Sequence, residues 1–240
     1  MVAGLQGDAP AARCLAPRRP LASGFVLRWH EEVLDAAGHA AAARLAAATG
    51  SFYLAGGTAL ALRLGHRVSL DLDLFSAKNA LGAEERRTLF DTLKASGPLK
   101  IKAAKDGACH LDLGGTPVSL FHYAYPMLGR PQSWRSLDVA SLEDIAAMKL
   151  SAVLGRGSKK DFIDLYELCQ RPGLDRVMTA AGRKFPLHAD FPLQAARALL
   201  YFEDAEKEPM PRMLGATTWE DMKSYFEGAI PKYVKAHLKG

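Results

Sequence analysis

The chain has 240 residues, of which 49% are hydrophobic, and can therefore bury the core of one large domain or two small ones. Its net charge of +5 permits a polyanionic partner without requiring one, because no long run of lysine and arginine occurs. The three scattered cysteines lack the spacing of a zinc site and indicate a reducing compartment. No apolar segment approaches the roughly 20 residues of a membrane span, so we expect a cytoplasmic protein.

The first half of the chain predicts helices mixed with strands. Residues 1–24 are rich in alanine, proline, arginine and glycine, and are expected to form a flexible tail. Residues 25–49 contain strong helix formers and are followed by Gly50, which predicts one or two helices. The patterning then predicts a buried strand in 51–57, a short helix in 58–65 and an alternating strand in 67–75.

Further strands are predicted next, and after them the residue pattern becomes helical. Residues 84–96 predict a helix, and residues 99–105 and 109–123 predict strands, with Gly114 and Gly115 at a hairpin. From Ser141 onward the patterning is helical and is broken by prolines. We therefore expect an α/β (α+β) domain with a mixed sheet over 25–130 and a helical bundle domain over 131–240.

Two aspartates in the strand predicted over residues 67–75 are candidate metal ligands. Alternation places Asp71 and Asp73 on one face and Leu70, Leu72 and Leu74 on the other. Same-face positions lie roughly 6.5–7 Å apart along a strand, so both carboxylates can converge on a divalent cation. A lone pair of this kind is more often the solvated face of an amphipathic strand.

Two glycines upstream of this strand, taken together with the aspartates, make the sequence signal for a functional site more specific. Gly56 and Gly57 end a predicted strand, and the next helix is expected to start at Thr58. Glycines allow backbone amides to approach a phosphate, and a helix N-terminus adds a favourable dipole and free N–H donors. A tight turn would explain the glycines alone, but an acidic strand directly after the helix favours a phosphate and metal site.

A lysine occupies an apolar stripe in the second half. Ser141 is a predicted N-cap with Asp144 as a cap acid, and Lys149 falls at the centre of the apolar stripe of the helix that follows. Its ammonium either reaches outward past its neighbours or meets an anion at the domain boundary, from the strand pair or from a triphosphate. In isolation, Asp161 and Asp164 read as acids of a solvated first helical turn.

The order of strand, Gly-Gly-Thr, helix and acidic strand resembles the polymerase β-like nucleotidyltransferase superfamily. Four longer segments, followed by Trp219, resemble the AbiEii/AbiGii toxin family of nucleotidyltransferases: GGTALALRLGHRVSLDLDLF, LFHYAYPML, DIAAMKLSAVLGRGSKKDFIDLYEL and LLYFEDAEKEPMP. The similarity runs from Phe52 to the C-terminal helix. It implies a polymerase β-like nucleotidyltransferase domain over 25–130.

The resemblance assigns roles to individual residues. Mg²⁺ is expected at Asp71 and Asp73, with Lys149 and Asp161 as further catalytic residues, while Asp164 is expected to brace the structure. The expected nucleotide-binding residues, with His66 in support, are Gly56, Gly57, Thr58, Arg67, Ser69 and Lys160. The strand over 117–126 offers no third carboxylate, and Asp112 is a candidate substitute because it would share a face with Ser119.

The resemblance also implies partners. A nucleoside monophosphate would pass from a nucleoside triphosphate to a hydroxyl of RNA, with tRNA the expected acceptor. The protein would be the toxin of a bacterial toxin-antitoxin or abortive-infection system, restrained by an antitoxin protein. Two alternatives remain open: an antibiotic-modifying enzyme with a small acceptor, and a catalytically silent nucleotide- or protein-binding module of the same fold.

Overall fold

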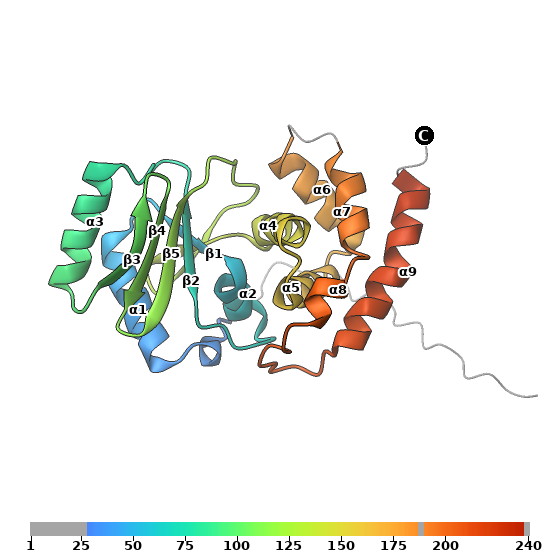
Figure 1. The fold of residues 1–240 in the computed structure, drawn as a ribbon, viewed down its shortest axis with the longest axis horizontal. Coiled ribbons are helices and arrows are strands. Elements are labelled where there is room, and N and C mark those ends of the chain that lie inside the picture. The colour runs from blue at the N-terminus through green and yellow to red at the C-terminus, as the bar shows by residue number, and fades with distance from the viewer. Residues whose placement is uncertain (1–27, 187–189, 238–240) are drawn as a thin grey trace, which may run out of the picture.

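A computed structural model describes residues 28–186 and 190–237, and the tail predicted over residues 1–24 lies outside these ranges. A seven-stranded mixed sheet occupies one side of the molecule and a group of helices the other (Figure 1). None of the helices within the described ranges combines the length and apolar character needed to cross a bilayer.

The elements before the acidic strand agree with the predicted types. A 3₁₀ helix η1 (Glu31–Val33) precedes α1 (Ala36–Ala48), and strand β1 (Tyr53–Ala55) is followed by helix α2 (Gly56–Leu64). Helix α2 ends at Gly65, which adopts the left-handed conformation with a φ of +64°. It begins at Gly56, two residues before the predicted start, so both glycines belong to its first turn.

The remaining strands form hairpins on both sides of a central pair. Helix α3 (Ala83–Ala95) separates strand β2 (Leu72–Ser76) from strand β3 (Lys100–Lys105). The predicted hairpin turn at Gly114 and Gly115 is confirmed. The strands are β2 (Leu72–Ser76), β3 (Lys100–Lys105), β4 (Ala108–Leu113), β5 (Thr116–His122), β6 (Gln132–Trp134) and β7 (Leu137–Val139).

The sheet has the order β3-β4-β5-β2-β1-β7-β6. Strands β2 and β5 are parallel, as are β1 and β7, and the other neighbours are antiparallel. Strands β6 and β7 lie beyond residue 130, where the helical bundle was predicted to begin. They extend the sheet past β1, so the sheet continues to residue 139.

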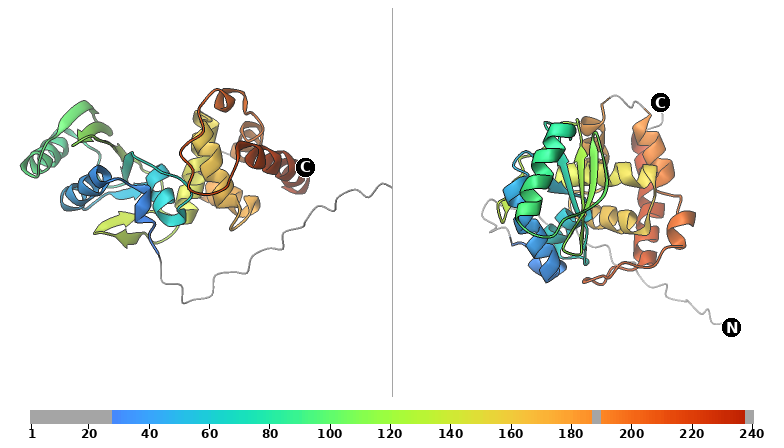
Figure 2. Two further views of the ribbon diagram at one scale, coloured as in Figure 1. Left: turned by 90° about the horizontal axis from the view of Figure 1, so that it is seen from below. Right: turned by 60° about the vertical axis from the view of Figure 1, so that its left-hand side comes forward.

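The sheet has one buried and one partly exposed face. Helices α1 and α3 cover one face of the sheet (Figures 1 and 2). Leu72 and Leu74 are buried, whereas Asp73 and Phe75, which alternate with them along β2, are partly exposed on the other face and line a cleft. Strand β2 begins only at Leu72. The alternation predicted to include Leu70 is therefore wrong at that residue, whose side chain is 52% exposed because it lies in the loop before the strand.

Helix α4 (Leu142–Gly155) lies at the centre of the helical part. It contacts α2 of the sheet domain and three helices of its own domain. Those three are α5 (Lys159–Cys169), α6 (Leu174–Lys184) and α7 (Phe191–Ala198), and the part is completed by α8 (Glu203–Glu206) and α9 (Trp219–His237). Helix α4 thus connects the sheet to the helices.

The N-terminus of α4 is capped as predicted, because Ser141 Oγ accepts a hydrogen bond of 3.0 Å from the Asp144 amide. Asp144 does more than a cap acid, since its carboxylate is fully buried. It accepts hydrogen bonds from Lys184 Nζ at 2.8 Å and from the amides of Leu128 at 2.9 Å and Gly129 at 3.1 Å. One carboxylate therefore joins α4, α6 and the loop that leads from the sheet.

Candidate active site

A cleft of about 550 Å³ lies where strand β2 meets helices α2, α4 and α5. It brings together residues that are far apart in the sequence. The predicted site residues that line it are Gly56, Gly57, Arg67, Ser69, Asp71, Asp73, Lys149 and Lys160. Thr58 and Asp161 lie behind this lining, each in contact with residues that face the cleft.

Thr58 holds the loop before the acidic strand in place. Its side chain is buried, and its Oγ1 lies 2.8 Å from Ser69 Oγ and also contacts the carbonyl oxygen of Asp71. Thr58 was expected to help bind phosphate, and in the structure its hydroxyl makes internal contacts. Thr58 positions Ser69 and Asp71 at the edge of the cleft.

The glycines at the start of α2 leave no room for side chains. Gly56 has a φ of +70°, and a Cβ atom there would lie 2.8 Å from Asp73 Oδ2. A Cβ atom at Gly57 would overlap Arg67 Nη2 and lie 3.3 Å from Ser69 Oγ. The start of the helix is thus a bare backbone edge beside the acidic strand, as an approaching phosphate would require.

The two predicted metal ligands lie together at this edge. Both line the cleft, and burial together with the charge of Asp71 raises the pKa of Asp73. Within the described ranges neither carboxylate forms an ion pair, because the neighbouring cations pair with acids of α5. Two crowded carboxylates without a cation suit Mg²⁺, which takes one or two protein carboxylates and completes its shell with water and substrate phosphates.

A third carboxylate does not complete this pair. Ser119 on β5 lies directly opposite Asp73 in the sheet register. Asp112, the predicted substitute, shares the face of Ser119 but does not line the cleft. Its carboxylate accepts a 2.8 Å hydrogen bond from the Gly115 amide and lies 3.4 Å from Lys102 Nζ. In the described residues no group of three or more His, Cys, Asp and Glu side chains is arranged to hold a metal ion.

Lys149 faces the acidic pair from α4 and is 4% exposed. Its Nζ lies 2.9 Å from Asp161 Oδ1 and 2.6 Å from Asp164 Oδ2, so the anions that it meets come from α5 and not from the strand pair. Burial lowers the pKa of the ammonium, but the two carboxylates outweigh burial and raise it overall. Lys149 therefore remains charged at neutral pH.

Asp161 fixes a second cation at the cleft. Its carboxylate accepts hydrogen bonds from Arg156 Nε at 2.6 Å and Nη2 at 3.0 Å, and from Ser158 Oγ at 2.6 Å. Burial raises the pKa of Asp161, yet the bonds from Arg156 and Ser158 and the charge of Lys149 hold it well below its ordinary value. Asp161 stays ionised and orients both Lys149 and Arg156.

Asp164 is fully buried and anchors the loop between α2 and β2. It accepts hydrogen bonds from Arg67 Nε at 2.7 Å and Nη2 at 2.8 Å, and its Oδ1 lies 2.7 Å from His66 Nε2. Although burial opposes ionisation, Lys149 and Arg67 hold the pKa of Asp164 well below its ordinary value. These contacts fit the bracing role expected for Asp164. They also make Arg67 a fixed charge in the cleft wall.

A segment from near the C-terminus completes this loop. The Val68 amide donates to the carbonyl of Arg212 at 2.9 Å, the Leu214 amide donates to the carbonyl of His66 at 2.8 Å, and Arg67 pairs with Met213 in an isolated antiparallel bridge. The loop that leads into the acidic strand β2 is therefore held both by α5 and by residues near 213.

Sequence reasoning did not include some cleft residues in the site. Arg156 lines the cleft, and its position just before the acidic start of α5 was the available signal. Phe75, Phe121 and Tyr123 form an aromatic part of the wall. Phe75 follows Asp73 at strand spacing, which places it on the same face, but an aromatic residue at that spacing is ordinary core patterning in most strands.

Comparison with solved structures finds proteins to which the chain is similar. The chain is similar in structure to the antibiotic-resistance factor ANT(2'')-Ia, with 17% identity, a TM-score of 0.49, and coverage of 66% of this chain and 96% of the other. It is also similar to MenT4, the nucleotidyltransferase toxin Rv2826c of Mycobacterium tuberculosis H37Rv, with 15% identity, a TM-score of 0.41, and coverage of 82% and 84%.

Sequence comparison identifies a closer relationship. An uncharacterized protein of Aquifex aeolicus (strain VF5) is 34% identical over 194 residues, which cover 77% of this chain and 88% of the relative. The family model for the nucleotidyl transferase AbiEii toxin of type IV toxin-antitoxin systems matches residues 41–108 and 132–238. Those two segments contain the acidic strand, Lys149 and Asp161, and together they make up most of the chain. The chain therefore belongs to the AbiEii family of nucleotidyltransferase toxins.

Proposed function

We propose that this nucleotidyltransferase moves a nucleoside monophosphate from a nucleoside triphosphate to a hydroxyl group of RNA, with Mg²⁺ held by Asp71 and Asp73. One observation carries the proposal. Two carboxylates without ion-pair partners in the described residues face a wall of fixed cations across a cleft. Such a cleft is suited to a metal-bound triphosphate, because the acids take the metal and the cations take the phosphates.

Different residues of the chain have different roles in the proposed reaction. The backbone amides of Gly56 and Gly57 donate to phosphate oxygens, and Lys149 and Arg156 neutralise the charge that builds up on the phosphates. Bound Mg²⁺ would supply Lewis-acid stabilisation of that same charge. The acceptor hydroxyl attacks the α-phosphorus, its proton passes to solvent, and pyrophosphate leaves with the bond to the α-phosphorus broken.

The charge of the cleft favours RNA over a cationic antibiotic as the acceptor. Beside the two proposed metal ligands, the lining carries no further acid and four cations, which are Arg67, Lys149, Arg156 and Lys160. A polycationic antibiotic requires free carboxylates around its amino groups. Asp161 and Asp164 behind the lining pair with Arg67, Lys149 and Arg156, but the four cations still outnumber these two acids, and this excess of positive charge suits a polyanionic acceptor.

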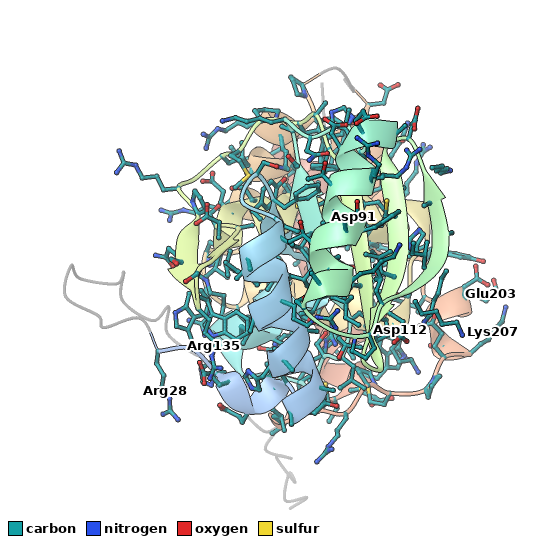
Figure 3. The ribbon with its side chains drawn as sticks, turned by 90° about the vertical axis from the view of Figure 1, so that its left-hand side faces the viewer. Arg28, Asp91, Asp112, Arg135, Glu203 and Lys207 are labelled. Atoms are coloured by element: carbon teal, nitrogen blue, oxygen red, sulfur yellow. The ribbon has the colours of Figure 1, made fainter. Side chains whose placement is uncertain are left out.

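The test incubates the purified protein and Mg²⁺ with each α-labelled nucleoside triphosphate and total RNA. Asp73→Asn keeps the shape of the side chain but removes a proposed metal ligand, so label transfer should fall by about a hundredfold or more. Asp91→Asn is the matched control, because Asp91 is exposed on the outer surface of α3, far from the cleft (Figure 3). Transfer that survives Asp73→Asn would contradict the metal assignment. No transfer to RNA, but transfer to an aminoglycoside, would favour the antibiotic-modifying alternative.

We also infer that the protein acts as the toxin of a two-component system and is restrained by an antitoxin protein. The family assignment supports this inference, because the AbiEii model describes type IV toxin-antitoxin systems. Induced expression in a bacterial host should slow growth, and expression of the Asp73→Asn variant should not. Co-expression of a neighbouring gene product should restore growth. Equal growth with the wild type and the variant would contradict a toxic activity.

A further inference from the structure

The sheet face that forms one wall of the cleft continues beyond it onto strands that the proposed reaction does not use. Register places Asp73 opposite Ser119, and Ser119 opposite His110 on β4. Phe75 likewise lies opposite Phe121. These residues share one face, which we call the open face because its side chains are partly or fully exposed, whereas the alternate residues are buried.

The edge of the open face is basic. All six residues of β3 are exposed, and register places Lys100 opposite Asp112 and Lys105 opposite Ala108. Both lysines therefore share the face of His110. Among the described residues, neither Lys100 nor Lys105 has a carboxylate within ion-pair distance, whereas Lys102 pairs with Asp112. Three strand spacings of about 4.8 Å each separate the acidic strand from this edge.

Aromatic rings lie between the acidic pair and the basic edge. Phe75 and Phe121 are stacked, with ring centroids 5.3 Å apart and an interplanar angle of 28°. The edge of Tyr123 meets Phe75 at 5.4 Å, and His110 meets Phe121 edge-on at 5.6 Å. All four side chains line the cleft, so their rings are available to a ligand.

We propose that the open face holds the single-stranded 3′ end of the RNA acceptor, with bases against Phe75 and Phe121 and phosphates near Lys100 and Lys105. This assignment rests on the proposed function. Aromatic rings beside a row of cations are the surface that binds single strands, because unpaired bases can stack while the backbone follows the charges. The face begins at Asp73, so a strand bound there brings its terminal hydroxyl to the metal site.

The test compares two matched pairs of substitutions in the full chain. Lys100→Gln with Lys105→Gln removes two charges from the open face, and Lys232→Gln with Lys235→Gln removes two exposed charges from α9. The probe is a short, fluorescein-labelled single-stranded RNA, whose binding is followed by anisotropy at several salt concentrations. A third variant, Phe121→Leu, keeps apolar volume but removes the ring.

The variant with Lys100→Gln and Lys105→Gln, the β3 pair, should bind RNA more weakly and should have a KM for RNA that is roughly tenfold higher. The logarithm of its RNA-binding constant should also depend less steeply on the logarithm of the salt concentration, by about 0.7 for each lost phosphate contact. Phe121→Leu should raise the KM for RNA by a similar factor without a change of salt slope. The kcat and the binding of the nucleoside triphosphate should change little in the variant that lacks Lys100 and Lys105, because neither lysine lines the cleft. The variant with Lys232→Gln and Lys235→Gln, the α9 pair, should match the wild type in RNA binding, KM and salt dependence.

The outcomes separate this inference from the function on which it rests. Normal transfer to RNA, with KM and salt slope unchanged in both the β3 pair and Phe121→Leu, overturns the open-face assignment and leaves the function standing. An equal loss in the β3 and α9 pairs also overturns it, because only total charge would then matter. Conversely, RNA binding that depends on Lys100 and Lys105, in a protein that transfers nothing, supports the surface and contradicts the proposed function.

Discussion

Gly56 places a bare backbone beside the carboxylate of Asp73, a proposed metal ligand, and its conformation leaves little tolerance for any other residue. Its φ is +70°, a value that costs an L-residue roughly 1–2 kcal/mol. An added Cβ atom would also lie 2.8 Å from Asp73 Oδ2 and would push that carboxylate aside. Conformation and contact therefore act against a substitution at the same point.

We expect Gly56→Ala to lower nucleotidyl transfer at least about tenfold while the free energy of unfolding falls by only about 1–2 kcal/mol. Transfer assays and urea unfolding measure the two effects. Gly228→Ala is the control, because Gly228 lies in α9 with open space around it, and alanine favours a helix. Full activity in Gly56→Ala would show that Asp73 does not depend on this contact.

Part of the site could be predicted at the scale of the residue. The acidic pair, the glycines and Lys149 were identified because strand alternation, a helix start and a lysine in an apolar stripe are local patterns. The partners of Asp164 could not be predicted in the same way, since Arg67 is 97 positions away and only the fold brings the two together. Arg67 and Thr58 were therefore expected to bind phosphate, and the structure gives their side chains internal partners.

At the scale of the element, α4 is tied to α6 by one buried and one exposed ion pair. Lys184 Nζ lies 2.8 Å from Asp144 Oδ1 with both side chains fully buried, and Arg183 Nη1 lies 2.6 Å from Glu143 Oε1 with both partly exposed. A buried charge that loses its partner is costly, whereas an exposed pair contributes little. The two adjacent pairs should therefore differ sharply in energy.

A double-mutant cycle tests this difference. Asp144→Asn and Lys184→Met should each lower the free energy of unfolding by about 3 kcal/mol, and the double variant should lose less than the sum because no charge is left alone. The same cycle on Glu143→Gln and Arg183→Gln should give a coupling energy below about 1 kcal/mol. Equal coupling in the two cycles, measured by urea unfolding, would contradict the role given to burial.

Element types followed from the sequence more reliably than element limits. The helices and the strands up to β5 were predicted because their apolar periods and glycine boundaries are clear. Strands β6 and β7 were missed because each has three residues, too few to show a period, and the pairing of β7 with β1 and of β6 with β7 is set by the sheet. Strand β2 begins later than predicted, since Thr58 and Ser69 hold the preceding residues in a loop.

At the scale of the whole molecule, buried carboxylates determine how stability depends on pH. The pKa values of Asp144, Asp161 and Asp164 are held below the ordinary value, in each case by cationic and hydrogen-bonding partners that outweigh burial. The unfolded chain takes up protons at these residues before the folded protein does. Acidification therefore favours unfolding, and the stabilisation is fully present only above the ordinary aspartate pKa of 3.8.

We expect the free energy of unfolding to be nearly constant near neutral pH and to fall steadily below about pH 5. Chemical unfolding at a series of pH values measures this slope. The double variant Asp144→Asn with Lys184→Met should show a shallower fall, because one of the three depressed carboxylates is gone. The raised pKa of Asp73 contributes with the opposite sign, so Asp73→Asn should steepen the fall. Stability that rises on acidification would contradict these assignments.

The return of residues near 213 to the loop at 66–68 has a consequence for the newly made protein. That loop leads into the acidic strand, and it gains the backbone partners of this segment only after residues 212–214 have been synthesised. A growing chain that ends before Arg212 has the acidic pair and the glycines but lacks the segment that holds them in place. In a protein of a toxin family, this order of synthesis leaves the loop without these partners until the segment around residue 213 has been made and has folded back onto it.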